Sequence, residues 1–125
     1  MSDSIADFGN SELWVIQSTL KERYNRDIPF EIGDSEIRLL PSDRTLTPCP
    51  VIYWNVENVN FVIFKTGAER YRCQFYYRLY QQYGTNKFEF DNIGDCVITL
   101  LQTQADYATQ EKQNQEKQDQ ENTQT

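Results

Sequence analysis

The sequence predicts an α+β domain: an antiparallel β-sheet of four to five strands, an N-terminal helix, a C-terminal helix and a disordered C-terminal tail. The stretch from Val51 to Phe90 predicts the sheet, because it holds 12 of the 17 aromatic residues, interleaved with Val and Ile as in paired strands. Apolar residues at three- and four-residue spacing on both sides of this stretch predict the two helices. The last 17 residues contain no aliphatic or aromatic side chain to bury, which predicts disorder.

The two predicted helices lie near the two ends of a single predicted domain. The first spans about residues 12–26, and Asn10 or Ser11 is its expected cap because a short side-chain oxygen can accept from the free amides of the first turn. The second spans residues 93–108. The predicted organisation is therefore a flexible N-terminus (1–10), a single α+β domain (11–108) and a disordered Gln-rich tail (109–125).

The central stretch divides into strands at 51–56, 59–65 and 70–80, with weaker strand signals at 30–32, 36–40 and 88–90. The Glu57-Asn58 step fits a two-residue hairpin, which places Trp54 opposite Phe61. A second two-residue turn at Gly67-Ala68 then gives the side of the sheet that we predict to be the core face: Val51, Tyr53, Val62, Phe64, Tyr71, Cys73, Phe75 and Tyr77. An odd number of residues in either connection would move the third strand's side chains to the opposite side.

The other side of the sheet is the predicted partner-binding face. Apolar side chains, forked Arg donors for carboxylates and an open strand edge together fit a segment of another protein. The predicted contact residues are Ile52, Trp54, Phe61, Arg72, Tyr76 and Arg78. Self-association as a homodimer is the competing interpretation of this face. A nucleic-acid-binding or other small regulatory protein that uses the Arg/Tyr-rich strand is the alternative from another class, which the net charge of -7 opposes.

The composition argues against an enzyme. Histidine is absent, which removes the commonest general base and the imidazole ligands of metal sites. The three cysteines show no CxxC spacing and are expected to be reduced, largely buried thiols. No nucleotide-binding, metalloprotease or hydrolase motif occurs. We therefore expect no catalytic, metal-binding or cofactor-binding residues and no cofactor.

The expected location is the cytoplasm. The first residues are acidic and lack the basic and apolar regions of a signal peptide. No run of about 18 apolar residues is present to span a membrane. The expected partner is therefore another protein, with neither a membrane nor a nucleic acid involved.

Three segments carry a resemblance to a known family: the hairpin PCPVIYWNVENVNFVIF, the basic-aromatic strand YRCQFYYRLYQQYG and the closing helix FDNIGDCVITLLQTQADY. Over roughly residues 11–107 the chain resembles the CcmS family of cyanobacterial β-carboxysome shell-assembly factors. The resemblance implies a non-enzymatic assembly chaperone that binds a CcmK-type carboxysome shell protein through that protein's C-terminal extension. It also implies association with the carboxysome, the compartment of photosynthetic carbon fixation. It implies no contact residues, so those named above depend on strand alternation alone.

Overall fold

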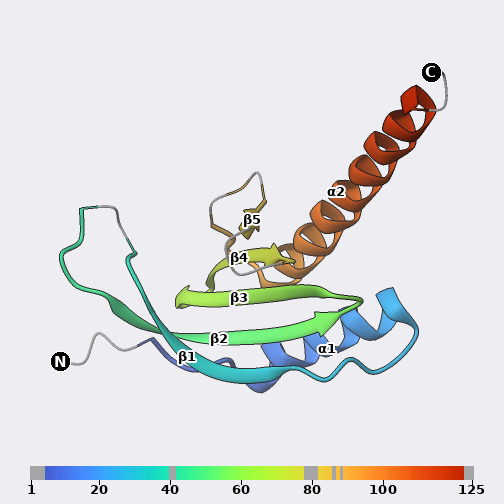
Figure 1. Ribbon diagram of the computed structural model, residues 1–125. Coiled ribbons are helices and arrows are strands. Elements are labelled where there is room, and N and C mark those ends of the chain that lie inside the picture. Colours follow the sequence, from blue (N-terminus) through green and yellow to red (C-terminus); the bar gives the residue numbers. More distant parts are fainter. Residues whose placement is uncertain (1–4, 40–41, 78–81, 86, 88, 123–125) are drawn as a thin grey trace.

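The computed structural model describes residues 5–39, 42–77, 82–85, 87 and 89–122, the side chain of Gln82 and the side chains after Gln110 excepted (Figure 1). Its elements are α1 (Asn10–Tyr24), β1 (Glu31–Ile37), β2 (Thr47–Val56), β3 (Val59–Gly67), β4 (Arg70–Tyr76), β5 (Gln82–Gly84) and α2 (Ile93–Asn122). The five strands form one antiparallel sheet in sequence order. The predicted α+β class, with an N-terminal and a C-terminal helix, is confirmed.

Helix α1 begins earlier than its apolar spacing predicts, because Glu12 satisfies a free amide at its start. The Glu12 carboxylate accepts a 2.7 Å hydrogen bond from the Gly9 amide. At the other end Asn25 adopts a left-handed conformation, φ 57, and its amide donates to the Lys21 carbonyl oxygen at 2.8 Å. The cap is therefore Gly9 in place of the predicted Asn10 or Ser11, and the helix ends at Tyr24.

The hairpin between β2 and β3 has the predicted register. Glu57 and Asn58 both have positive φ angles, 52 and 68, as a two-residue turn that matches the twist of its strands requires. Trp54 therefore lies opposite Phe61, and Ile52 lies opposite Ile63.

The connection between β3 and β4 differs from the prediction by one residue. Gly67 pairs with Arg70, but the register shifts between Lys65 and Gly67, so that Lys65 pairs with Tyr71. Thr66 is thus an extra residue in β3, a bulge that breaks the strict alternation of sides. Because of this shift the odd-numbered residues of β4 move to the side of Trp54, with Phe61 opposite Phe75.

Both helices cover that side of the sheet. The predicted core face is therefore wrong for β2 and β3, whose core residues are on the side of Trp54, but Tyr71 and Phe75 of β4 are core residues as predicted. The side chains buried beneath the helices include Ile16 and Leu20 from α1 and Val97 and Leu100 from α2. The strands contribute Ile52, Trp54, Val56, Val59, Phe61, Ile63, Tyr71 and Phe75 to the same core. Burial of this aromatic and aliphatic area is the main favourable contribution to folding.

Helix α2 starts beside β4 and then projects away from the sheet (Figure 1). Its start is capped by Asn92, whose side-chain oxygen accepts from the Asp95 amide at 3.0 Å. Tyr107 is the last aromatic side chain of α2 and packs against Tyr83 and Phe75, with ring centroids 4.5 and 5.8 Å away. Beyond it the backbone stays helical to Asn122, through the segment predicted as a tail. None of the helices that the structure describes combines the length and apolar character needed to cross a membrane.

Candidate partner-binding face

The sheet face opposite the helices is the candidate site, and we call it the open face. Its central side chains come from β2, β3 and β4 and alternate with those of the core. All of them are half-buried: Val51, Tyr53, Asn60, Val62, Phe64, Arg72, Gln74 and Tyr76. The open face is therefore an apolar strip with polar groups toward β4.

The open face is concave. Ile37 at the end of β1 and Arg72 on β4 line the same cavity of about 460 Å³. In a flat sheet three strand spacings would hold β1 and β4 about 14 Å apart. The sheet must therefore curl toward the open face, and the bulge at Thr66 favours this because bulges increase local twist.

The guanidinium of Arg72 connects the two sides of this concave face. Its Nη2 donates to the Leu39 carbonyl oxygen at 2.5 Å, and Nη1 donates to the Arg38 carbonyl oxygen at 3.4 Å. Its Nε lies 3.4 Å from Oε2 of Glu89, which also accepts from the Thr66 hydroxyl at 3.1 Å. Arg72 thus holds the curled sheet in shape, and its charge is partly balanced within the chain.

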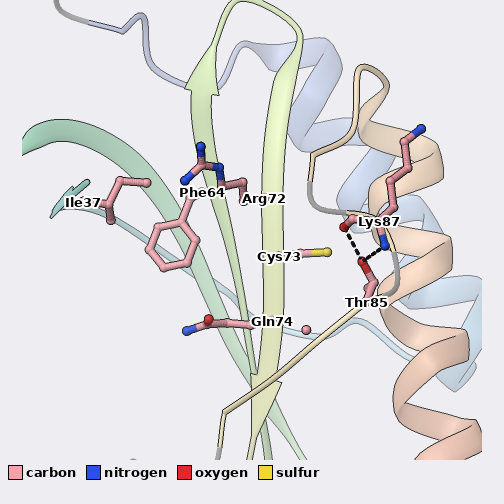
Figure 2. A pocket seen from close by; sticks show the side chains of 8 residues that line it. Ile37, Phe64, Arg72, Cys73, Gln74, Thr85 and Lys87 are labelled. Atoms are coloured by element: carbon pink, nitrogen blue, oxygen red, sulfur yellow. Dashed lines mark hydrogen bonds between the residues drawn. The ribbon is translucent and has the colours of Figure 1, made fainter. Parts of the chain in front are cut away.

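Figure 2 shows the walls of the cavity. Ile37 and Phe64 lie on the side of the Arg72 guanidinium, whereas the sulfur of Cys73 points away from it, toward Thr85 and Lys87. The Thr85 hydroxyl donates to the Lys87 carbonyl oxygen at 2.8 Å, which orders this wall. A cavity of this volume with apolar and hydrogen-bonding walls is large enough for side chains of a bound segment.

A hydrogen-bonded row lies at the other end of the open face. The Tyr53 hydroxyl donates to Oδ1 of Asn60 at 2.5 Å, and Nδ2 of Asn60 donates to the Tyr76 carbonyl oxygen at 3.2 Å. Burial raises the pKa of Tyr76, so its hydroxyl remains protonated at neutral pH. This end of the face can therefore offer hydroxyl and amide groups to a partner.

The structure brings together only part of the predicted contact set. Ile52, Trp54 and Phe61 are 0, 1 and 0% exposed beneath the helices, so their prediction as partner contacts is wrong. Arg72 and Tyr76 do lie together on the open face, and Arg78 lies outside the described residues. The reason is the extra residue at Thr66, which exchanges the two sides of β4 relative to β3.

Four residues of the open face were missed because they were assigned to the core: Val51, Tyr53, Val62 and Phe64. Their alternation along β2 and β3 was read correctly, and only the side covered by the helices was wrong. A signal for the bulge would have corrected the assignment, but no residue type at 65–67 identifies one unambiguously.

Two further cavities lie on the helix side of the molecule. One of about 270 Å³ lies between α1 and α2 and includes Ile98, which is 47% exposed. The other, of about 450 Å³, lies beside the ion pair of Lys65 and Glu12. Within the part of the chain that the structure describes, no group of three or more Cys, Asp or Glu residues could hold a metal ion.

No protein-family model matches the chain, and comparisons with curated proteins and with solved structures find no match.

Proposed function

We propose that this protein is a non-enzymatic binding protein that takes up a segment of another protein on its open face. The observation that carries the proposal is the concave, half-buried apolar strip that the two helices leave uncovered. Monomeric proteins rarely leave a contiguous apolar surface of this kind without an interaction to cover it. An extended segment fits best, because a concave sheet face can accommodate a chain that runs along or across its strands.

The polar groups of the open face suit the recognition of such a segment. Arg72 lies at the cavity with its guanidinium already oriented by the Leu39 carbonyl oxygen and by Glu89. A guanidinium held in this way can add a hydrogen bond to a carboxylate at a lower entropic cost than a free side chain. Phe64 and Val62 supply the apolar contact beside it.

The partner that we propose is a carboxysome shell protein of the CcmK type, bound through its C-terminal extension. This part of the proposal rests on the resemblance of residues 11–107 to CcmS-type assembly factors. In this role the protein acts as a chaperone without a cofactor, in the cytoplasm and in association with the carboxysome, and keeps shell subunits competent for ordered assembly.

Isothermal titration of the purified chain with a CcmK-type shell protein, and with a peptide of its C-terminal extension, tests the proposal. Val62→Glu places a charge on the open face and should weaken binding at least about tenfold, or about 1.4 kcal/mol. Ile98→Glu is the matched control, because it places the same charge at an exposed apolar position on α2. Its affinity should equal that of the unmodified chain.

The other outcomes discriminate among the alternatives. Equal losses of affinity in Val62→Glu and Ile98→Glu would mean that the open face is not the binding site. If neither shell protein nor peptide binds, and light scattering gives a tight dimer that Val62→Glu dissociates, then the open face serves self-association. Binding of RNA or DNA with a steep salt dependence would support the nucleic-acid alternative.

A further inference from the structure

Two of the three cysteines face each other where α2 packs on β4. The Cys73 sulfur lies 4.0 Å from the Cys96 carbonyl oxygen, in hydrogen-bonding contact. Cys96 is fully buried in the first turn of α2, whereas Cys73 is half-buried and lines the cavity of about 460 Å³. The pair therefore combines a half-buried cysteine at the wall of a cavity with a fully buried cysteine beside it.

We propose that Cys73 and Cys96 form a peroxide-sensitive thiol pair that closes into an intramolecular disulfide. In the first step the Cys73 sulfur attacks one oxygen of hydrogen peroxide and gives up its proton, the O–O bond breaks and the departing oxygen takes up that proton as water, so that Cys73 becomes a sulfenic acid. In the second step the Cys96 sulfur attacks the Cys73 sulfur, and the sulfenic oxygen leaves as water after taking up a proton. The sum is two thiols and one hydrogen peroxide giving one disulfide and two water molecules, a two-electron oxidation of the protein.

The position of each sulfur sets the order of the two steps. Figure 2 shows the Cys73 sulfur directed into the space beside Thr85 and Lys87, at the wall of the cavity. Cys96 has no exposed surface through which peroxide could reach it. Peroxide therefore meets Cys73 first, and Cys96 lies in position to resolve the sulfenic acid.

The environment of Cys96 disfavours its thiolate while both cysteines are reduced. A hydrogen bond to Cys73 and burial both raise the pKa of the Cys96 thiol, which keeps it protonated. Conversion of Cys73 to a sulfenic acid alters its hydrogen bond to Cys96, because the partner of Cys96 is then no longer a thiol. The attack of Cys96 on Cys73 thus follows the oxidation of Cys73.

Peroxide treatment of the folded chain, followed by alkylation and tryptic mass spectrometry without reduction, tests the proposal. Cys73 falls in the peptide 73–78, Cys96 in 88–112 and Cys49 in 45–65, so that all pairings are distinguishable. The expected product is peptide 73–78 linked to 88–112, with Cys49 still alkylated. The test is independent of the proposed partner, because it uses the purified chain alone.

A sulfenic-acid trap provides the control. Dimedone should label Cys73 strongly in Cys96→Ser, where no resolving thiol remains, and at least about tenfold less in the unmodified chain, where the disulfide competes. Dimedone labelling of Cys73 in the unmodified chain without the linked peptides would overturn the proposal. So would disulfides that involve Cys49 or link two chains, or the absence of any oxidation at Cys73. The unmodified chain alone decides these outcomes, so a folding defect in the variant would not prevent the test.

Discussion

The Arg72 guanidinium donates a 2.5 Å hydrogen bond to the Leu39 carbonyl oxygen and so joins β4 to the end of β1 across the concave face. The Nε atom of the same guanidinium lies 3.4 Å from the Glu89 carboxylate. Sequence alternation assigned Arg72 a role in contacting a partner, whereas in the structure it also maintains the shape of the site. Substitution of Arg72 should therefore change the open face itself as well as its affinity for a partner.

Arg72→Ala should expose the thiol of Cys49. Cys49 is fully buried on β2, its burial raises the pKa of its thiol, and the Arg72 charge nearby opposes that shift. Loss of the hydrogen bonds from a charged donor should also lower the free energy of unfolding by about 1–3 kcal/mol. Native-state maleimide labelling, followed by mass spectrometry of the tryptic peptide 45–65, should show labelling at least about tenfold faster.

Arg70→Ala is the matched control for this substitution. Arg70 lies on the same strand, its side chain is exposed, and no ion pair forms to it among the described residues. Its loss should leave the labelling rate of Cys49 unchanged. Equal acceleration in both variants would mean that Arg72 does not hold the sheet over Cys49.

A second prediction concerns Glu12, which joins α1 to the sheet. Its carboxylate lies 2.9 Å from Nζ of Lys65 and also accepts hydrogen bonds from the Tyr71 hydroxyl and the Gly9 amide. Burial raises the pKa of Glu12, but these three partners outweigh it and hold the pKa below its ordinary value of 4.5. A lowered pKa means that the stabilisation is complete above about pH 4.5 and is lost as the pH falls through the pKa of the folded state.

Glu12→Gln should therefore reduce the free energy of unfolding by about 3 kcal/mol at pH 7, because Lys65 loses its buried partner. The difference from the unmodified chain should begin to shrink below about pH 4.5, where Glu12 is protonated in the unfolded chain, and shrink further as the pH falls through its lowered pKa in the folded chain. Urea unfolding at several pH values measures both effects. Glu22→Gln, at an exposed position on the same helix, should show no such pH dependence, and a constant difference in Glu12→Gln would contradict the prediction.

The fold and the site differ in how far the sequence predicts them. Both helices, the order of the central strands and the pairing of Trp54 with Phe61 follow from local patterns, because spacing and turn chemistry determine them. The site depends on which side of the sheet the helices cover, and that choice depends on register. One extra residue at Thr66 places Tyr71 and Phe75 on the same side of the sheet as Phe61, and no local pattern indicates it.

The two sides of β2 and β3 are also hard to tell apart from the sequence, because both carry apolar side chains. Trp54 and Ile52 alternate with Tyr53 and Val51, so apolarity alone does not distinguish the two sides. The structure separates them by burial: Trp54 is 1% exposed, whereas Tyr53 is half-buried. A binding face that must itself be apolar will often lead to this ambiguity.

A third prediction concerns the C-terminal part of α2. Tyr107 contacts Tyr83 through a 2.8 Å hydrogen bond between hydroxyl groups, whereas residues 108–110 are exposed. An isolated polar helix has marginal stability in water. Truncation after Gln110 should leave the free energy of unfolding unchanged within about 0.5 kcal/mol. Chemical denaturation of both chains measures this, and a larger loss would show that the segment packs on the domain.

The last prediction tests directly which side of the sheet is the core. The two tryptophans differ strongly: Trp14 on α1 is 68% exposed, whereas Trp54 is 1% exposed and stacks on Phe61 with centroids 5.2 Å apart. Trp14→Phe, which retains Trp54, should show blue-shifted fluorescence that acrylamide quenches poorly. Trp54→Phe, which retains Trp14, should show red-shifted and readily quenched emission.

Substitutions of Trp54 should also lower the free energy of unfolding more than a substitution of Trp14. Trp14→Phe should leave it nearly unchanged, as expected for an exposed side chain. Trp54→Ala should cost about 3–5 kcal/mol, because it leaves a large cavity under the helices. Trp54→Phe should cost less, since the Trp54 indole nitrogen makes no hydrogen bond within the described part of the chain and none is lost. If Trp54 instead proves accessible to acrylamide and dispensable for folding, β2 presents it to solvent, and the open face must be assigned to the opposite side of the sheet.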